Sequence, residues 1–154
     1  MKIPSYFLLL LLTTTIFSCI DKSVPDFSEC TASGSLEKSV LATELIGTWE
    51  WQFMVCCPES DQGMKKDSNS FIGTKITFFD DGTGLKEDKS GIEDFTWTLK
   101  TVDTNYFGID SDPRIGVAWG RLFICNGQML SNDSYRDGAD NYFKKIKEGE
   151  ILPK

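Results

Sequence analysis

The chain contains 154 residues, with 16 basic and 23 acidic side chains, a formal net charge of -7, five cysteines and no histidine. This length allows one domain with short appendages. Without histidine the chain has no Ser-His-Asp or Cys-His nucleophile pair, no histidine zinc site and no imidazole acid-base catalyst, so we expect no enzyme and no cofactor. The acidic balance also excludes the basic surface that nucleic-acid binding requires.

The first eighteen residues have the pattern of an export signal. Lys2 carries a positive charge, and an almost uninterrupted apolar run follows from Ile3 to Phe17. Because a membrane-spanning helix needs about 20 apolar residues, this run is too short to be one. We therefore predict a signal peptide over residues 1–18.

The end of this segment, Ile16-Phe17-Ser18-Cys19, resembles a bacterial lipobox. The resemblance implies that Cys19 becomes the mature N-terminus and carries a diacylglycerol. The protein would then be held in the bacterial cell envelope by its lipid, and we expect the outer membrane. The alternative is an ordinary signal peptide in which Cys19 is incidental. Residues 19–38 are rich in Ser, Asp, Glu, Thr and Gly, which predicts a flexible tether.

A short helix is predicted from Ser39 to Ile46, because apolar residues recur on one helical face and Gly47 follows. From Gly47 onward, short apolar-rich runs are separated by Asp, Gly, Asn, Ser and Pro, which is typical of an all-β domain. A long polar loop is expected between Pro58 and Ser70. The eight predicted strands cover residues 49–55, 74–79, 85–89, 95–100, 106–109, 115–125, 128–131 and 141–146.

Two connections have strong hairpin signals, Asp80-Asp81-Gly82-Thr83-Gly84 and Asn126-Gly127. Eight short antiparallel strands avoid exposed edges when they close into an up-and-down barrel. The interior of such a barrel is filled by side chains or holds one small ligand. We therefore predict an all-β, eight-stranded antiparallel barrel preceded by a short helix, over residues 39–147, with a C-terminal tail at 148–154.

Gly47-Thr48-Trp49, directly after the predicted helix, resembles the G-x-W signature of the first lipocalin strand. The stretch from about residue 41 to 146, including its closing segment 134–146, resembles the lipocalin-like domains of exported lipoproteins from Bacteroidetes-type bacteria. The resemblance implies a calycin-type barrel with a pocket for a small apolar ligand. Two features depart from the family: residues 104–106 only echo its T-D-Y motif, and no arginine lies in the last strand to cover Trp49. That covering role is left to Arg136 or Arg121.

If the odd-numbered face of the first strand points inward, large aromatic side chains line the barrel. The candidate ligand-lining residues are Trp49, Trp51, Phe53, Phe78, Phe95 and Trp97. These side chains either form an apolar pocket or fill the barrel without leaving a cavity. Three hypotheses follow: a binding protein for a small apolar ligand, a non-enzymatic envelope protein with a solid barrel whose loops at 57–70 and 110–114 contact another protein, and a redox protein using Cys56-Cys57.

Four cysteines remain in the mature chain: Cys30, Cys56, Cys57 and Cys125. An oxidising compartment favours disulfides among them. The sequence permits three pairings and does not rank them. We expect one long-range bridge that uses Cys30 or Cys125, and buried free thiols are the alternative.

Carboxylate pairs are the remaining candidates for chemistry. They are Asp80 with Asp81, Asp110 with Asp112, and Asp133 with Asp137. All three lie in predicted turns, where Asp bonds its own backbone, so no catalytic pair is expected. Residues 133–138 imitate the start of an EF-hand loop, but Tyr135 and Lys144 stand where that loop needs ligands, so no metal site is predicted. The glycosylation-like triplet at Asn132 is explained by the same turn.

Overall fold

The computed structural model describes residues 37–59 and 63–146. The predicted signal peptide, Cys19, the tether up to residue 36 and Cys30 lie outside the described residues, as does the C-terminal tail. These ranges contain one 3₁₀ helix (Ser134–Arg136), one α-helix and nine strands: α2 (Lys38–Leu45), β1 (Gly47–Glu59), β2 (Gly63–Asp67), β3 (Lys75–Phe78), β4 (Thr83–Asp88), β5 (Gly91–Asp103), β6 (Tyr106–Asp112), β7 (Arg121–Cys125), β8 (Gln128–Asn132) and β9 (Ala139–Lys145). No helix in this part of the chain has the length and apolarity needed to cross a membrane.

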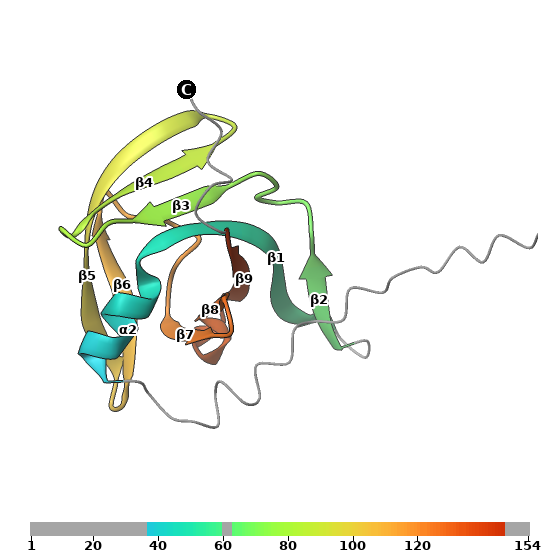
Figure 1. Ribbon diagram of the computed structural model, residues 1–154. Coiled ribbons are helices and arrows are strands. Elements are labelled where there is room, and N and C mark those ends of the chain that lie inside the picture. The colour runs from blue at the N-terminus through green and yellow to red at the C-terminus, as the bar shows by residue number, and fades with distance from the viewer. Residues whose placement is uncertain (1–36, 60–62, 147–154) are drawn as a thin grey trace, which may run out of the picture.

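The strands form an antiparallel, up-and-down barrel that is nearly closed. Their order is β6-β5-β4-β3-β1-β9-β8-β7, and β2 pairs with β1 outside this path. In Figure 1, β3 and β4 lie on one side of β1, β9, β8 and β7 lie on the other, and β5 and β6 complete the wall. The predicted fold class, an eight-stranded barrel preceded by a short helix, is confirmed.

The polar loop predicted between Pro58 and Ser70 is partly wrong. β1 continues to Glu59, and β2 returns along its outer half, from Met54 opposite Asp67 to Glu59 opposite Gly63. The first half of β1 pairs with β3 instead. Thus β2 and β3 follow each other along the same edge of β1. Within the described residues, the predicted loop is reduced to the short connection between β2 and β3, and residues 60–62 lie outside them.

The strand predicted over Ile115–Cys125 is also wrong in its first half, because only Arg121–Cys125 is a strand. Ile115, Val117 and Ala118 are nonetheless buried. The segment from residue 113 to 120 runs as an irregular loop from β6 to β7, where the backbone N–H of Ile115 donates to Ser111 Oγ at 3.0 Å. Its apolar side chains are therefore explained by burial in the core rather than by strand pairing.

Both predicted hairpins are confirmed. Asn126 and Gly127 have φ angles of 51° and 71°, the left-handed conformations that a tight two-residue hairpin requires. Gly82, at the β3–β4 turn, has a φ of 83°. The carboxylate of Asp81 accepts a hydrogen bond from the backbone N–H of Thr83 at 2.9 Å in the same turn.

Helix α2, predicted to within one residue, packs its Leu41 and Leu45 into the core. The indole N–H of Trp49 donates to the carbonyl O of Leu45 at 2.8 Å, which ties the helix to the first strand. Lys145 Nζ donates to the carbonyl O of Glu44 at 2.8 Å and lies 5.1 Å from the centre of a Trp49 ring. Lys145 of the last strand therefore covers Trp49, and the expectation that Arg136 or Arg121 does so is wrong.

All buried core residues among those described lie between Leu41 and Phe143, and all described strand pairs lie between Gly47 and Lys145. A chain that begins at residue 20 therefore contains the whole described fold, and we expect it to fold without residues 1–19.

Candidate functional site

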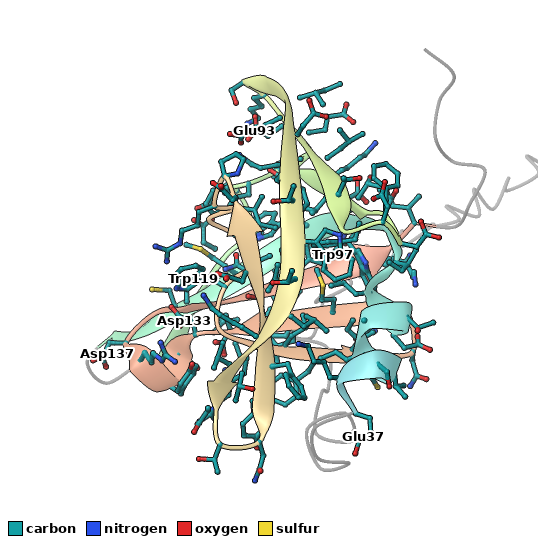
Figure 2. The ribbon with its side chains drawn as sticks, turned by 90° about the vertical axis from the view of Figure 1, so that its left-hand side faces the viewer. Glu37, Glu93, Trp97, Trp119, Asp133 and Asp137 are labelled. Carbon is teal, nitrogen blue, oxygen red and sulfur yellow. The ribbon has the colours of Figure 1, made fainter. Side chains whose placement is uncertain are left out.

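The six candidate ligand-lining residues all lie in the barrel core. Trp49, Trp51 and Phe53 alternate with partly exposed residues along β1, Phe78 comes from β3, and Phe95 and Trp97 alternate with exposed residues along β5. The predicted inward face of these strands is thus confirmed. Figure 2 shows Trp97 on β5, facing the part of the barrel next to α2.

The interior aromatic rings pack against one another. Phe78 is the centre of this cluster, with T-shaped contacts to Phe95 at 5.6 Å and to Trp97 at 5.5 Å between ring centres. Farther from α2, Phe53 stacks on Tyr142 of β9 at 4.6 Å. Burial raises the pKa of Tyr142, and Asp140 adds a smaller repulsive contribution. Such ring pairs each add about 0.5–1.5 kcal/mol beyond the burial of their area.

The hydrogen-bond donors of the core tryptophans are already used within the protein. Trp49 donates to the helix carbonyl described above, Trp51 donates to Asn141 Oδ1 at 2.9 Å, and Trp97 donates to the carbonyl O of Thr83 at 2.8 Å. An interior ligand would therefore find no free indole N–H on these three residues.

The packing next to α2 leaves no room for a ligand. Trp49, Ile76, Phe78 and Met129 are each 0% exposed. A side chain that borders a hollow as large as a water molecule keeps some accessible surface, so these four side chains border none. We conclude that this half of the barrel is a packed core rather than a pocket.

The carboxylate pairs are not brought together as catalytic groups. Asp80 and Asp81 are exposed in the β3–β4 turn. Asp110 on β6 forms an exposed ion pair with Lys100 of β5, at 2.5 Å between Nζ and Oδ1. Asp133 and Asp137 lie on the short β8–β9 connection (Figure 2). Within residues 37–59 and 63–146, no three Cys, Asp or Glu side chains are grouped as a metal site would need.

Asp140, which the sequence analysis did not single out, organises the β8–β9 connection. Its Oδ1 accepts hydrogen bonds from Asn132 Nδ2 at 2.9 Å, the backbone N–H of Asp133 at 3.0 Å and the backbone N–H of Ser134 at 2.9 Å. Its Oδ2 accepts from Ser134 Oγ at 3.0 Å. The resemblance of this segment to a calcium loop and to a glycosylation site is thus explained by a turn that holds its own carboxylate.

We predict that Asp140→Ala lowers the free energy of unfolding by about 2 kcal/mol, because two partly buried backbone N–H groups lose their acceptor. Asp140→Asn keeps an oxygen in the Oδ1 position and is expected to restore most of this loss. Urea unfolding followed by tryptophan fluorescence measures both. Equal destabilisation by the two variants would show that the negative charge, not the hydrogen bonding, stabilises the turn.

Three exposed carboxyl groups have pKa values below their ordinary range. The Lys86 ammonium and then Ser90 lower the pKa of Asp88, the Thr104 backbone N–H and then Arg121 lower that of Asp103, and Thr83 lowers that of Asp81. Because the folded-state values lie below the unfolded value of 3.8, their stabilisation is complete above pH 3.8 and is lost as the pH falls below it. We predict that the melting temperature is constant between pH 7 and 5 and falls below pH 4. An unchanged melting temperature at pH 3 would contradict this.

The strand register separates the described cysteines. Cys56 lies opposite Ala139 of β9, whereas Cys125 lies opposite Gln128, which pairs with Lys144 of β9. Ala139 and Lys144 are five residues apart, about 17 Å along a strand. A disulfide needs Cα atoms within about 7 Å, so Cys125 bonds neither Cys56 nor the next residue, Cys57. The register thus excludes the two pairings that join Cys125 to Cys56 or to Cys57.

Hollows bounded by described residues are found on the outer surface. Two of them adjoin the β4–β5 hairpin and share Asp88 and Ser90. A larger one, of about 660 Å³, lies at the α2 end between the start of β1 and the end of β9. Neither region was singled out from the sequence. The larger hollow combines side chains from strands that are far apart along the chain.

In comparisons with known proteins, no family model, no curated protein and no solved structure matches the chain at a significant level.

Proposed function

We propose that the protein is a non-enzymatic, exported lipoprotein of the bacterial envelope, whose lipocalin-like barrel is a solid scaffold that presents a protein-binding surface. The observation that supports a scaffold over a ligand carrier is the complete burial of Trp49, Ile76 and Phe78 in the half of the barrel next to α2. A carrier for a small apolar molecule needs about 300 Å³ of connected interior space. Next to α2, the side chains that would line such a space fill it instead.

The proposed binding surface is an apolar patch of Phe71, Ile72 and Ile92, which are 39%, 51% and 59% exposed. Phe71 and Ile72 belong to the β2–β3 connection and Ile92 to the start of β5. The hollow lined by Phe71 and Ile72 and the hollow lined by Ile92 share Asp88 and Ser90, so these apolar side chains lie in the same region of the surface. Exposed apolar side chains that cluster at one place on a soluble surface are typical of protein-binding sites.

The position of this patch suits a protein anchored by its N-terminus. Glu37, where the described chain begins, and Glu93, next to Ile92, lie at opposite ends of the molecule in Figure 2. A tether that enters at Glu37 therefore leaves the patch directed away from its point of attachment. An envelope-anchored scaffold would present Phe71, Ile72 and Ile92 to partners at a distance from its own membrane.

The experiment for the patch is photo-crosslinking in the native bacterium, with a photoreactive amino acid at position 92 of the full chain. We expect a discrete crosslinked protein that disappears when Phe71→Ser and Ile72→Ser are introduced together. Val40→Ser removes an apolar side chain of similar exposure on α2, 47%, and should leave the crosslink unchanged. Absence of a crosslink at position 92, or its survival in the double variant, would contradict the proposal.

Membrane attachment through Cys19 is the second part of the proposal, and the lipobox-like segment before it is its support. Cys19→Ala is expected to move the protein from the membrane fraction to the soluble fraction and to remove the lipid mass from its N-terminus. Cys30→Ala, the next cysteine along the chain, should leave fractionation unchanged. Membrane fractionation of the Cys19 variant would contradict the anchor.

We also propose that the exported chain forms the Cys30–Cys125 bridge and a vicinal Cys56–Cys57 bridge. Support comes from the register argument above and from the irregularity in the β1–β2 pairing between Cys56 and Pro58, where Cys57 is passed over. Peptide mapping without reduction is expected to yield a Cys30 peptide joined to a Cys125 peptide. A peptide joining Cys57 to Cys125 would contradict both the pairing and the described register.

A further inference from the structure

The hollow at the α2 end has the form of a binding groove. It has a volume of about 660 Å³ and crosses the start of β1, the end of β3, the β7–β8 turn and the end of β9. Its floor includes Thr48 and Thr77, whose hydroxyl groups hydrogen-bond each other at 3.0 Å across two strands. Phe79, which is 39% exposed, and Ile146 supply apolar walls. The volume lies within the range of about 300–1,000 Å³ that is usual for small-molecule sites.

Two lysine side chains border this groove, Lys144 and Lys145. Lys145 is half-buried, and its Nζ has one hydrogen-bond acceptor, the uncharged carbonyl O of Glu44, together with the face of Trp49. Within the described chain, the lysines in carboxylate ion pairs are Lys86 and Lys100, so neither lysine of the groove has such a partner there. The groove thus places two lysine side chains, neither in an ion pair within the described residues, beside an apolar surface; Glu50 of β1 lies opposite Lys144 in the strand register.

The described hydrogen-bond acceptor of Lys145 Nζ is a neutral carbonyl, so this ammonium group can also donate a charge-assisted hydrogen bond to a carboxylate. The adjoining apolar walls favour a ligand that also has a hydrocarbon chain. We propose that this groove binds a single-chain anionic amphiphile of the long-chain carboxylate class. The carboxylate contacts Lys145, and the hydrocarbon chain lies along Phe79 and Ile146. Lys144, on the other face of β9, adds positive charge at the edge of the groove. This site is outside the barrel and distinct from the patch of Phe71, Ile72 and Ile92.

The first test is a titration of the chain from residue 20 to 154 with dodecanoate, kept below its micelle concentration and followed by amide NMR. Gly47 and Gly127 line the groove on different elements and are suitable reporters. We expect saturable shifts at both glycines and none at Ile92. Dodecanol, which has the same chain and no charge, should bind at least tenfold more weakly, and dodecylammonium should not bind. Equal binding of all three, or shifts confined to the outer patch or the core, would overturn the proposal.

Variants of Lys144 and Lys145 distinguish the effect of their charge on binding from an effect on folding. Lys144→Gln together with Lys145→Arg keeps one charge, and we expect a severalfold loss of dodecanoate affinity. Lys144→Gln together with Lys145→Gln should lose at least tenfold, whereas Lys86→Gln at the far hairpin should change nothing. Retained affinity in the double glutamine variant overturns the proposal. Because Lys145 also contacts α2, each variant is first checked by its melting curve, and the comparison of dodecanoate with dodecanol on the unaltered chain needs no variant.

The chain's own residues 147–154 are the competing occupant, because they follow Ile146 and contain Glu148, Glu150, Ile151 and Leu152. A chain ending at residue 146 distinguishes the two. We expect its affinity for dodecanoate to equal that of the longer chain within about twofold. If dodecanoate binds only the shortened chain, the groove belongs to the C-terminal segment and the proposal is wrong.

Discussion

Replacing Gly120 with alanine is expected to lower the free energy of unfolding by about 2–5 kcal/mol. Gly120 stands directly before β7 with a φ of 92°, a conformation that costs an L-residue about 1–2 kcal/mol. A Cβ at this position would also overlap the backbone carbonyl of Asn132 in β8. That carbonyl cannot move freely, because Asn132 pairs with Arg121 in the β7–β8 ladder. Overlap with fixed backbone adds about 1–3 kcal/mol.

Gly120 also lies where β6 and β7, the two ends of the strand order, approach each other. A Cβ on Gly108 of β6 would overlap the carbonyl O of Gly120, so the two glycines allow β6 and β7 to approach without a hydrogen-bonded ladder. Gly116, four residues before Gly120, provides the matched control, because a Cβ there meets nothing within 4 Å. Urea unfolding should show Gly116→Ala within about 0.5 kcal/mol of the unaltered protein. If Gly120→Ala is as stable as the unaltered protein, the close approach of β6 and β7 does not depend on a glycine at position 120.

The second large effect is expected from Phe78→Ala, which should destabilise the fold by about 3–5 kcal/mol. Phe78 is fully buried and contacts the rings of Phe95 and Trp97, so its removal leaves a cavity at the centre of the core. The neighbouring Phe79 lies on the opposite side of the chain and is 39% exposed. Phe79→Ala is therefore the matched control, with an expected loss below about 1 kcal/mol.

This pair of variants distinguishes a packed core from a pocket wall. If Phe78 lined an existing pocket, its truncation would enlarge a space that is already present and cost much less. A loss below about 1 kcal/mol for Phe78→Ala, measured by the same urea unfolding, would contradict the packed barrel. The benzene-sized space that the variant creates is apolar and should bind benzene, which the unaltered protein should not.

The inward faces of β1 and β5 could be predicted because alternation follows directly from strand geometry. Trp49 to Val55 and Phe95 to Leu99 alternate with polar residues, and one side of each strand must be buried. Asn126-Gly127 could be predicted because its residues tolerate the backbone angles of a tight turn. These signals depend on neighbours in sequence, and they led to the correct fold class.

Three features of the fold could not be predicted from the sequence. The apolar residues Ile115, Val117 and Ala118 are buried by an irregular loop, and burial alone does not distinguish a loop from a strand. The β2 hairpin was missed because Gly63–Asp67 has no apolar alternation. Lys145 covers Trp49 because the register places them opposite each other, which composition cannot reveal.

The candidate site also has features that the sequence predicted and features that it did not. The sequence identified which aromatic residues face inward but not whether they enclose space, because packing depends on how rings from β1, β3, β5 and β9 meet. Asp140 and the groove at Lys144 and Lys145 were missed for the same reason. Each is built from residues that only the β8–β9 pairing and the β1–β9 pairing bring together.

A crystal structure of the protein under xenon pressure is the most direct test of the claim that the half of the barrel next to α2 has no interior pocket. Xenon enters apolar cavities that are empty of water and is visible at low occupancy. The packed core predicts no xenon atom among Trp49, Ile76 and Phe78 in the unaltered protein, and one bound atom in the Phe78→Ala variant. A xenon atom bound among these three residues in the unaltered protein would contradict the claim.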